Sequence, residues 1–261
     1  MCSTPPARND GGQVCAFAAS VYDRFMQDQT SRALAAKDVL YEDNHLLVVN
    51  KAAGLLTQAA QSGDDCLLER AREYVRVRYN KPGKAFMGLV HRLDRNVSGV
   101  VVLARTSKAA SRLSQAFAKR LVDKRYLALV VGRAADSAEL RDVLAPKAQG
   151  RGVERSREGK EALLRYTCIA RSGGVSLLEV VLMTGRKHQI RAQLAFSGLP
   201  LVGDPLYGTA SRSLRRPALH ASWLSLEHPV RKESCSFHAP LPLALKSHLQ
   251  SLGISPDVKL F

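Results

Sequence analysis

The sequence predicts an α+β fold built on one central sheet. Short β-prone runs outnumber the helical segments, and the two kinds of element do not alternate strictly along the chain, which disfavours a doubly wound parallel sheet. With 261 residues, of which 46% are hydrophobic, the chain can bury one sizeable core or at most two small ones. Its longest apolar runs fall far short of the roughly 20 residues that span a bilayer, so no membrane segment is expected.

The start of the chain differs in composition from the rest. Residues 1–36 are rich in Ala, Ser, Pro and Gly, and we expect them to form a poorly ordered extension. Two strands follow, at residues 39–42 and 46–50, separated by the turn sequence Asp43-Asn44. An acidic residue at position 64 or 65 can cap a helix that runs to residue 78, because apolar residues recur there every three or four positions.

The middle of the chain predicts a strand, a sharp loop and a second strand. The strands are residues 86–90 and the β-branched run 100–103, and the charged segment 91–99 connects them. Ser107 is expected to cap the next helix, in which Leu113, Phe117 and Leu121 are spaced by four residues.

The remaining elements complete the sheet. Strands are predicted at residues 126–131, 163–169, 175–183, 218–226 and 235–238. A helix over residues 187–197 ends at Gly198, and a C-terminal helix begins near Pro242. Residues 147–160 form a loop-like segment with five Lys or Arg against two Glu, which is either a phosphate-contacting arm or an ordinary solvated hairpin loop.

The charge balance indicates the class of partner. The chain has 39 Lys and Arg against 23 Asp and Glu, a formal net charge of +16. The excess positive charges repel one another, and an enzyme that acts on a neutral small molecule does not need them. A polyanion, most simply a nucleic acid, is therefore the expected partner. The five cysteines are scattered without a C-x-x-C pair, which favours a reducing intracellular compartment. Residues 1–20 lack the features of a secretory signal, but they do not exclude an organellar address. The cytoplasm is the expected location, and an organelle stays open.

The segment HRLDRNVSG, residues 91–99, places Asp94 between Arg92 and Arg95 at the junction of two apolar strands. Neighbouring positive charges favour the ionised form of a carboxylate, which suits a nucleophile or an anionic stabiliser. A structural Asp-Arg turn is the alternative. His91, Asp94 and Ser98 also suggest a hydrolase triad, but no G-x-S-x-G elbow is present and working triads assemble from distant segments.

A second block, residues 185–208, gathers Arg186, Lys187, His188 and Arg191 near a predicted helix start, where phosphate or carboxylate groups bind readily. An ordinary surface helix is the alternative. The turn GDPLYG that follows is expected to be architectural. No metal site is expected, since His220 and His228 would lie about 26 Å apart on one strand. No nucleotide cofactor is expected either, because no phosphate-binding glycine motif occurs.

Taken together, the motif blocks resemble the RluA-type family of RNA pseudouridine synthases. They are, in chain order, LLVVNKAAGLLTQ, HRLDRNVSG, KRYLALVVG, GRKHQIRAQL, LVGDPLYG and ALHASWLSLEHP, and the likeness covers about residues 38–240. The resemblance implies the family's catalytic fold over residues 37–261, with a mixed, largely antiparallel sheet flanked by helices. It also implies an isomerase that converts specific uridines in an rRNA or tRNA stem-loop to pseudouridine without a cofactor or metal. The sequence does not indicate the oligomeric state, and a monomer is the default expectation.

The resemblance carries roles onto individual residues. Asp94 is implied as the group beside ribose C1′. It would either attack the sugar as a nucleophile or help to form a glycal intermediate. Tyr126 is implied to stack on the flipped base, and Arg191 to pair with Asp94. Arg92 would fill the space that the base leaves. Arg95, Arg186 and His188 are implied phosphate or ribose contacts, and Ile190 a wall of the pocket.

Three departures from the family pattern stand out. Ala52 replaces the usual Pro, and Val97 replaces the usual Thr, which removes a hydroxyl near Asp94. The first 36 residues leave little room for the small RNA-binding S4 domain of many relatives, so none is expected. A catalytically silent RNA-binding or ribosome-assembly factor with the same fold remains the alternative function.

Overall fold

The computed structural model describes residues 33–208 and 214–255. The predicted extension therefore lies mostly outside the described residues. Its last part does not behave as an extension, because Leu34 is buried in the main core and its N–H donates to the carbonyl of Arg70 at 3.2 Å. A short 3-10 helix, η1 (Ala36–Asp38), then leads into the first strand.

The described part of the chain forms a sheet of eleven strands, which confirms the predicted α+β class. The main path of the sheet runs in the order β1-β2-β4-β10-β5-β9-β8-β6-β7, while β3 pairs with β4 and β11 with β10. Among the pairings between named strands of the described chain, only that of β4 with β10 is parallel. The strands are β1 (Val39–Glu42), β2 (Leu46–Lys51), β3 (Gly88–Leu89), β4 (Ser98–Ala104), β5 (Asp123–Val131), β6 (Ser137–Pro146), β7 (Val153–Arg155), β8 (Lys160–Ser172), β9 (Val175–Leu182), β10 (Leu219–Glu227) and β11 (Ser234–His238).

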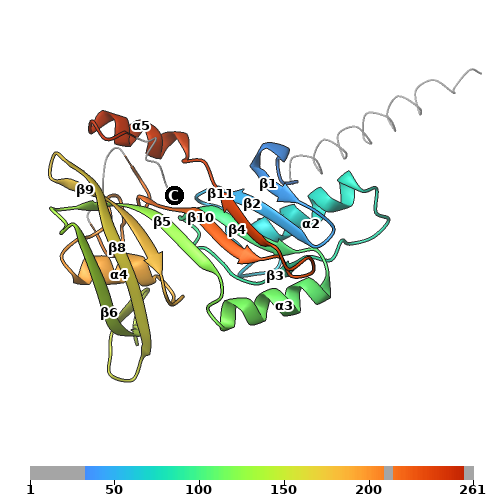
Figure 1. Cartoon of the computed structure of the whole chain (residues 1–261), viewed down its shortest axis with the longest axis horizontal. Helices are drawn as coiled ribbons and strands as arrows, with labels where there is room; N and C mark the ends of the chain where they lie inside the picture. Colours follow the sequence, from blue (N-terminus) through green and yellow to red (C-terminus); the bar gives the residue numbers. More distant parts are fainter. Residues whose placement is uncertain (1–32, 209–213, 256–261) are drawn as a thin grey trace, which may run out of the picture.

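Four α-helices of the described chain cover the two faces of this sheet (Figure 1). They are α2 (Leu67–Arg78), α3 (Ser107–Ala118), α4 (Gln189–Phe196) and α5 (Leu243–Ser251). Because side chains alternate between faces along a strand, β5 sends Tyr126 and Ala128 to the core shared with α2 and α4. Its alternate residues Leu127 and Leu129 pack with α5. Helix α3 packs on Val100 and Val102 of β4.

Strand β4 is buried along its whole length, as expected for a β-branched run with helices on both faces. It begins at the end of the charged loop, where Gly99 allows close approach to β10. Gly99 has φ +124°, and a Cβ there would lie 2.1 Å from the carbonyl oxygen of Ala221. Only glycine fits this position, so the residue that ends the predicted loop also sets the parallel pairing of β4 with β10.

Several predicted boundaries were wrong. The strand expected at residues 86–90 is reduced to β3, and β6 was missed altogether. Helix α3 begins after Thr106, whose side chain accepts a hydrogen bond from the N–H of Ala109, and Leu121 lies beyond its end with 67% of its surface exposed. The basic segment 147–160 is a hairpin that contains β7 and leads into β8. Within the described ranges, no helix is long and apolar enough to cross a membrane.

Candidate active site

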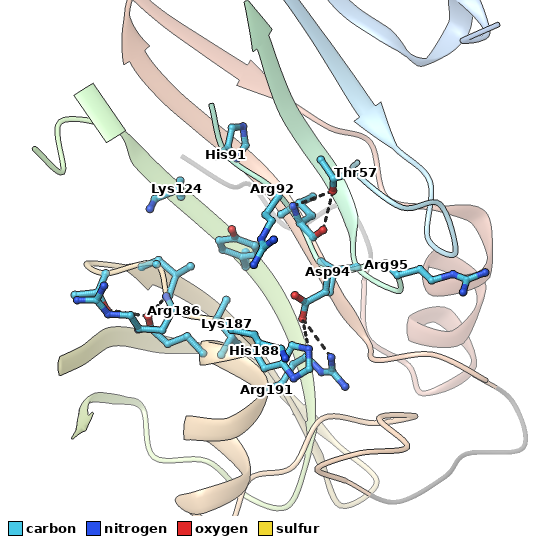
Figure 2. A pocket seen from close by; sticks show the side chains of 18 of the residues that line it. Thr57, His91, Arg92, Asp94, Arg95, Lys124, Arg186, Lys187, His188 and Arg191 are labelled. Carbon is cyan, nitrogen blue, oxygen red and sulfur yellow. Dashed lines mark hydrogen bonds and ion pairs between the residues drawn. The ribbon is translucent and has the colours of Figure 1, made fainter. Parts of the chain in front are cut away.

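A cavity of about 1390 Å³ opens beside the loop that precedes β4 (Figure 2). Its wall comes mainly from the segment after β2, the loop 91–97, the end of α3, the start of β5, the hairpin 147–160, and the segment between β9 and α4. The described residues that line it include eight Lys or Arg and one carboxylate, that of Asp94. The cavity is therefore strongly electropositive, which suits a polyanionic ligand.

The loop that carries Asp94 is held by the segment after β2. The Thr57 hydroxyl donates to the carbonyl of Leu93 at 2.7 Å and accepts from its N–H at 3.2 Å. The Gly54 N–H donates to the carbonyl of Arg95 at 2.8 Å. These contacts fix the backbone on both sides of Asp94, so the carboxylate is presented from a rigid loop (Figure 2).

Lys51 completes this clamp from inside the fold. Its side chain is buried, and its ammonium donates to three carbonyl oxygens: Ala52 at 2.9 Å, Leu55 at 2.8 Å and Arg95 at 3.1 Å. Burial lowers the pKa of Lys51 to about 7, while the nearby Asp94 carboxylate raises it and Arg216 lowers it further. Three carbonyl acceptors need three N–H donors, which only the charged form has. The geometry therefore favours the ammonium.

Asp94 is held from one side. Its Oδ2 lies 3.2 Å from Nη1 of Arg191 and 3.7 Å from Nε2 of His188. No hydrogen bond or ion pair joins Oδ1 to any residue that the structure describes, and 29% of the Asp94 side chain is exposed to the cavity. The carboxylate thus has one anchored oxygen and one open oxygen.

Arg191 joins Asp94 to a second carboxylate that the sequence did not reveal. Its Nε lies 2.7 Å from Oδ2 of Asp204, and its Nη2 lies 2.8 Å from Oδ1. The Asp204 side chain is completely buried. Burial alone would raise the pKa of Asp204, but the Arg191 hydrogen bond and the N–H of Leu206 lower it below its usual value. The turn GDPLYG therefore positions the guanidinium, a role that its turn chemistry did not predict.

Tyr126 and Ile190 form the apolar part of the site. Tyr126 lies on the face of β5 that packs towards α4, and both residues are buried and line the cavity. Burial raises the pKa of Tyr126 far above 10, and the Asp94 charge raises it further. The phenol is therefore neutral, and it lines the same cavity as the Asp94 carboxylate.

The flanking arginines do not pair with Asp94, although they are its neighbours in the sequence. Arg95 turns away from Asp94, and its Nε donates to the carbonyl of Gly54 at 2.9 Å (Figure 2). Arg92 is exposed at the cavity and makes no ion pair with a described residue. The cation in contact with Asp94 is Arg191, 97 positions away in sequence. Only the folded chain brings this charge to the loop.

Arg186 and His188 lie before helix α4, which starts two residues later than expected. The Nε of Arg186 donates to the carbonyl of Glu161 at 2.8 Å, so this side chain is tied to β8 at the cavity rim. His188 caps α4 in a left-handed conformation, with φ +53°, and faces Asp94. The cavity also includes Arg120, which no sequence motif had singled out, together with Lys124 of the block KRYLALVVG and Arg151 of the basic segment 147–160.

The alternative chemistries find no support in the geometry. His91 accepts a hydrogen bond from the N–H of Val102 and stacks on Phe117, and Ser98 pairs with His220. The hydrolase triad is therefore not assembled. Within residues 33–208 and 214–255, no three His, Cys, Asp or Glu side chains come together in a way that could hold a metal ion.

Comparisons with known proteins agree with one another. A family model described as RNA pseudouridylate synthase matches residues 45–196. Ribosomal large subunit pseudouridine synthase D of Xanthomonas campestris is 36% identical over 234 residues, which cover 82% of this chain and 69% of that protein. A Bacillus subtilis protein named uncharacterized RNA pseudouridine synthase YjbO is 34% identical over 226 residues, which cover 84% of this chain and 79% of its own length.

Solved structures support the same fold. Human RNA pseudouridylate synthase domain containing 4 aligns with a TM-score of 0.71 at 24% identity and covers 88% of this chain and 98% of its own. Human RNA pseudouridylate synthase domain containing 1 aligns with a TM-score of 0.64 at 25% identity and covers 84% and 96%. The chain therefore belongs to the RluA-type RNA pseudouridine synthases, the isomerases that convert uridine to pseudouridine in RNA.

Proposed function

We propose that this chain modifies uridines in the RNA of the large ribosomal subunit and that Asp94 is the group that acts on the ribose. The single observation that carries the proposal for Asp94 is its setting. It is the only carboxylate among the described residues that line a cavity with eight cations, and one of its oxygens is open. Several relatives that are 32 to 36% identical are named ribosomal large subunit pseudouridine synthases, which supports the choice of RNA.

The reaction sets three requirements, and the residues of the cavity suit each of them. The bond from C1′ to N1 of uracil must break, the base must turn, and C5 must bond to C1′. C5 then loses its proton and N1 gains one, so the atoms balance without an external reagent. Asp94 would act on C1′, either as a nucleophile or by way of a glycal. The neutral ring of Tyr126 would stack on the detached base and, with Ile190, keep it in the cavity.

A uridine in structured RNA must leave its stack before it can reach Asp94, which costs a few kcal/mol. Arg92 is exposed at the mouth of the cavity and has no ion-pair partner among the described residues. We place it in the space that the extruded base leaves, where it offsets part of this cost. Arg186, Lys124 and Arg151 would contact phosphates around the same nucleotide, as would the basic hairpin 147–160 from which Arg151 extends.

The proposed site is complete within one chain, since Asp94, Tyr126 and Arg191 all come from the same polypeptide. A monomer is therefore the assembly that we propose. We also propose that the protein is located in the cytoplasm. Ribosomal RNA as substrate favours this location, and so do the free thiols at Cys66, Cys168 and Cys235.

The test is tritium release from RNA that carries tritium at C5 of uridine. Transcripts of large-subunit rRNA and of tRNA would be incubated separately with the wild-type protein and with Asp94→Asn. We expect the rRNA to release tritium with the wild-type protein only, while Asp94→Asn binds the RNA within a few-fold of wild type. Release from tRNA alone would overturn the choice of RNA. RNA binding without release from either transcript would favour the silent assembly factor.

A further inference from the structure

His188 bridges the Asp94 carboxylate and the Tyr207 hydroxyl. Its Nε2 lies 3.7 Å from Oδ2 of Asp94, and its Nδ1 lies 3.1 Å from the Tyr207 hydroxyl. The two rings meet edge to face, with centroids 5.7 Å apart at an angle of 86°. The left-handed backbone of His188 is uncommon for a residue with a side chain. This backbone conformation places the imidazole between the two groups.

Tyr207 is itself held from several directions. The N–H of Val153, in the basic hairpin, donates to its hydroxyl at 2.7 Å. The guanidinium of Arg191 lies over its ring at 5.3 Å from the centroid. Gly152 has φ +114°, and a Cβ there would lie 2.8 Å from the Tyr207 hydroxyl. The hairpin therefore reaches Tyr207 only because residue 152 has no side chain.

These contacts fix the direction of the hydrogen bond to His188. The Tyr207 oxygen already accepts from Val153, so its own proton is free to go to Nδ1 of His188. Burial lowers the pKa of His188, while Asp94 raises it and Arg191 lowers it again, which favours the neutral ring. A neutral imidazole that accepts at Nδ1 carries its proton at Nε2. That proton faces Asp94.

We propose that Tyr207 is a positioning residue that holds His188 as an Nε2–H donor to Oδ2 of Asp94, so that Oδ1 is the oxygen presented to the ribose. The inference rests on the proposed role of Asp94 and adds which oxygen acts and what orients it. Arg191 and His188 both approach Oδ2, and no described residue pairs with Oδ1. The separation of 3.7 Å exceeds a direct hydrogen bond. The proposal therefore requires this contact to shorten when substrate fills the site, as catalytic contacts commonly do.

The test compares four variants in single-turnover tritium release, with RNA affinity measured separately. Tyr207→Phe removes the hydroxyl and keeps the ring. His188→Gln places an amide nitrogen near the position of Nε2, whereas His188→Asn reaches only the position of Nδ1. The fourth variant combines His188→Gln with Tyr207→Phe. Tyr41→Phe is the matched control, because Tyr41 also donates a hydroxyl hydrogen bond, to Asp43 at 2.8 Å, but outside the cavity.

We expect Tyr207→Phe to lower the single-turnover rate about tenfold, the loss of one hydrogen bond, with RNA affinity within about twofold of wild type. His188→Asn should lose more, and His188→Gln should recover most of the rate. Adding Tyr207→Phe to His188→Gln should cost little more, because an amide has no tautomer to fix. Tyr41→Phe should match wild type.

Equal rates for His188→Gln and His188→Asn would overturn the proposal. So would a Tyr207→Phe effect that is as large in the His188→Gln protein as in the protein that keeps the histidine. A loss confined to RNA affinity would also overturn it, since the hydroxyl would then only support the hairpin. Thermal melts identify any variant that fails to fold. If Tyr207→Phe does not fold, the comparison of His188→Gln with His188→Asn still tests the proposal, because both variants keep Tyr207 and Val153. Failure of the proposed function itself gives a different result, namely full turnover by Asp94→Asn.

Discussion

Arg191 lies between two carboxylates that differ in burial. Asp204 is completely buried, whereas 29% of the Asp94 side chain is exposed. Removing the guanidinium would leave the Asp204 charge buried without a partner. We expect Arg191→Ala to lose activity and to lower the free energy of unfolding by about 3–5 kcal/mol, as measured by urea denaturation.

The control for this prediction is Arg165→Ala. Arg165 pairs with Glu139 at 2.8 Å on the exposed face of β8, and 61% of its side chain is accessible. A surface pair of this kind contributes about 1 kcal/mol or less. Equal losses of stability in the two variants would show that Arg191 is not needed to neutralise a buried charge.

Individual residues were predictable where a motif carried them. Asp94, Tyr126 and Arg191 stand in three separate blocks that resemble one family, and the fold brings all three to one cavity. The role of Asp204 was not predicted, because its neighbours in sequence indicate only a turn. The folded chain shows that this turn faces the guanidinium of Arg191. An acid next to a turn glycine, close in sequence to a selected arginine, is the signal that was available.

Lys51 shows how one side chain joins two elements. It ends β2 and donates to the carbonyl of Arg95 in the loop that carries Asp94. Replacing it by Met would leave three carbonyl oxygens without their donor. We expect Lys51→Met to lower the free energy of unfolding by on the order of 3 kcal/mol and to slow tritium release, because the loop that carries Asp94 loses its anchor. Lys108→Met, at an exposed position of α3, should change neither, and an equally mild effect at Lys51 would show that the clamp is dispensable.

His220 links β4 to β10 and makes stability depend on pH. It is buried, with Nδ1 at 2.9 Å from the Ser98 hydroxyl and Nε2 at 3.1 Å from the carbonyl of Ala239. Burial lowers its pKa to about 4, with a smaller opposing effect from the Ala239 carbonyl. The unfolded chain therefore takes up this proton at a higher pH than the folded chain does.

The free energy of unfolding should accordingly fall as the pH drops from about 6.5 towards 4. His220 alone should account for a loss of about 3 kcal/mol across that window. His91, whose pKa burial lowers to about 3, acts in the same direction. Urea denaturation at a series of pH values measures the slope. His220→Gln should flatten it by about one proton, and an unchanged slope in that variant would show that His220 is protonated equally in both states.

Elements were predictable where β-branched and other apolar residues concentrate. Strand β4 is a continuous run of this kind, and strands β8 and β9 were predicted as well. Strand β6 escaped because most of its residues are exposed or half-buried, and its apolar positions are mostly small or partly covered. It pairs along its length with β8, so its conformation depends on a partner that follows it in the chain. Local sequence does not reveal such a strand.

At the scale of the whole molecule, the positive charge is expected to determine how tightly RNA binds. The net charge of +16 and the cations around the cavity would neutralise phosphates of a bound RNA and release counterions. If about six phosphates are contacted, affinity should fall roughly 10³-fold between 50 and 200 mM salt. Filter binding over this range measures the slope, which Arg151→Ala should reduce by about one. Affinity independent of salt would mean that the charge serves some other purpose.

The overall architecture was predictable to the level of class and family. The number of strands and the face of the sheet on which the cavity opens followed only from the structure. Those features depend on pairings between distant segments, such as the parallel contact of β4 with β10 that Gly99 permits. Composition predicted a polyanionic partner without indicating where it binds.

The most direct measurement maps pseudouridines in the RNA of cells that lack this gene and in the same cells supplied with wild-type protein or with Asp94→Asn. We expect one or more large-subunit rRNA positions to lose the modification, and the wild-type protein to restore it while Asp94→Asn does not. Identical maps with and without the gene, or restoration by Asp94→Asn, would contradict the role assigned to this carboxylate.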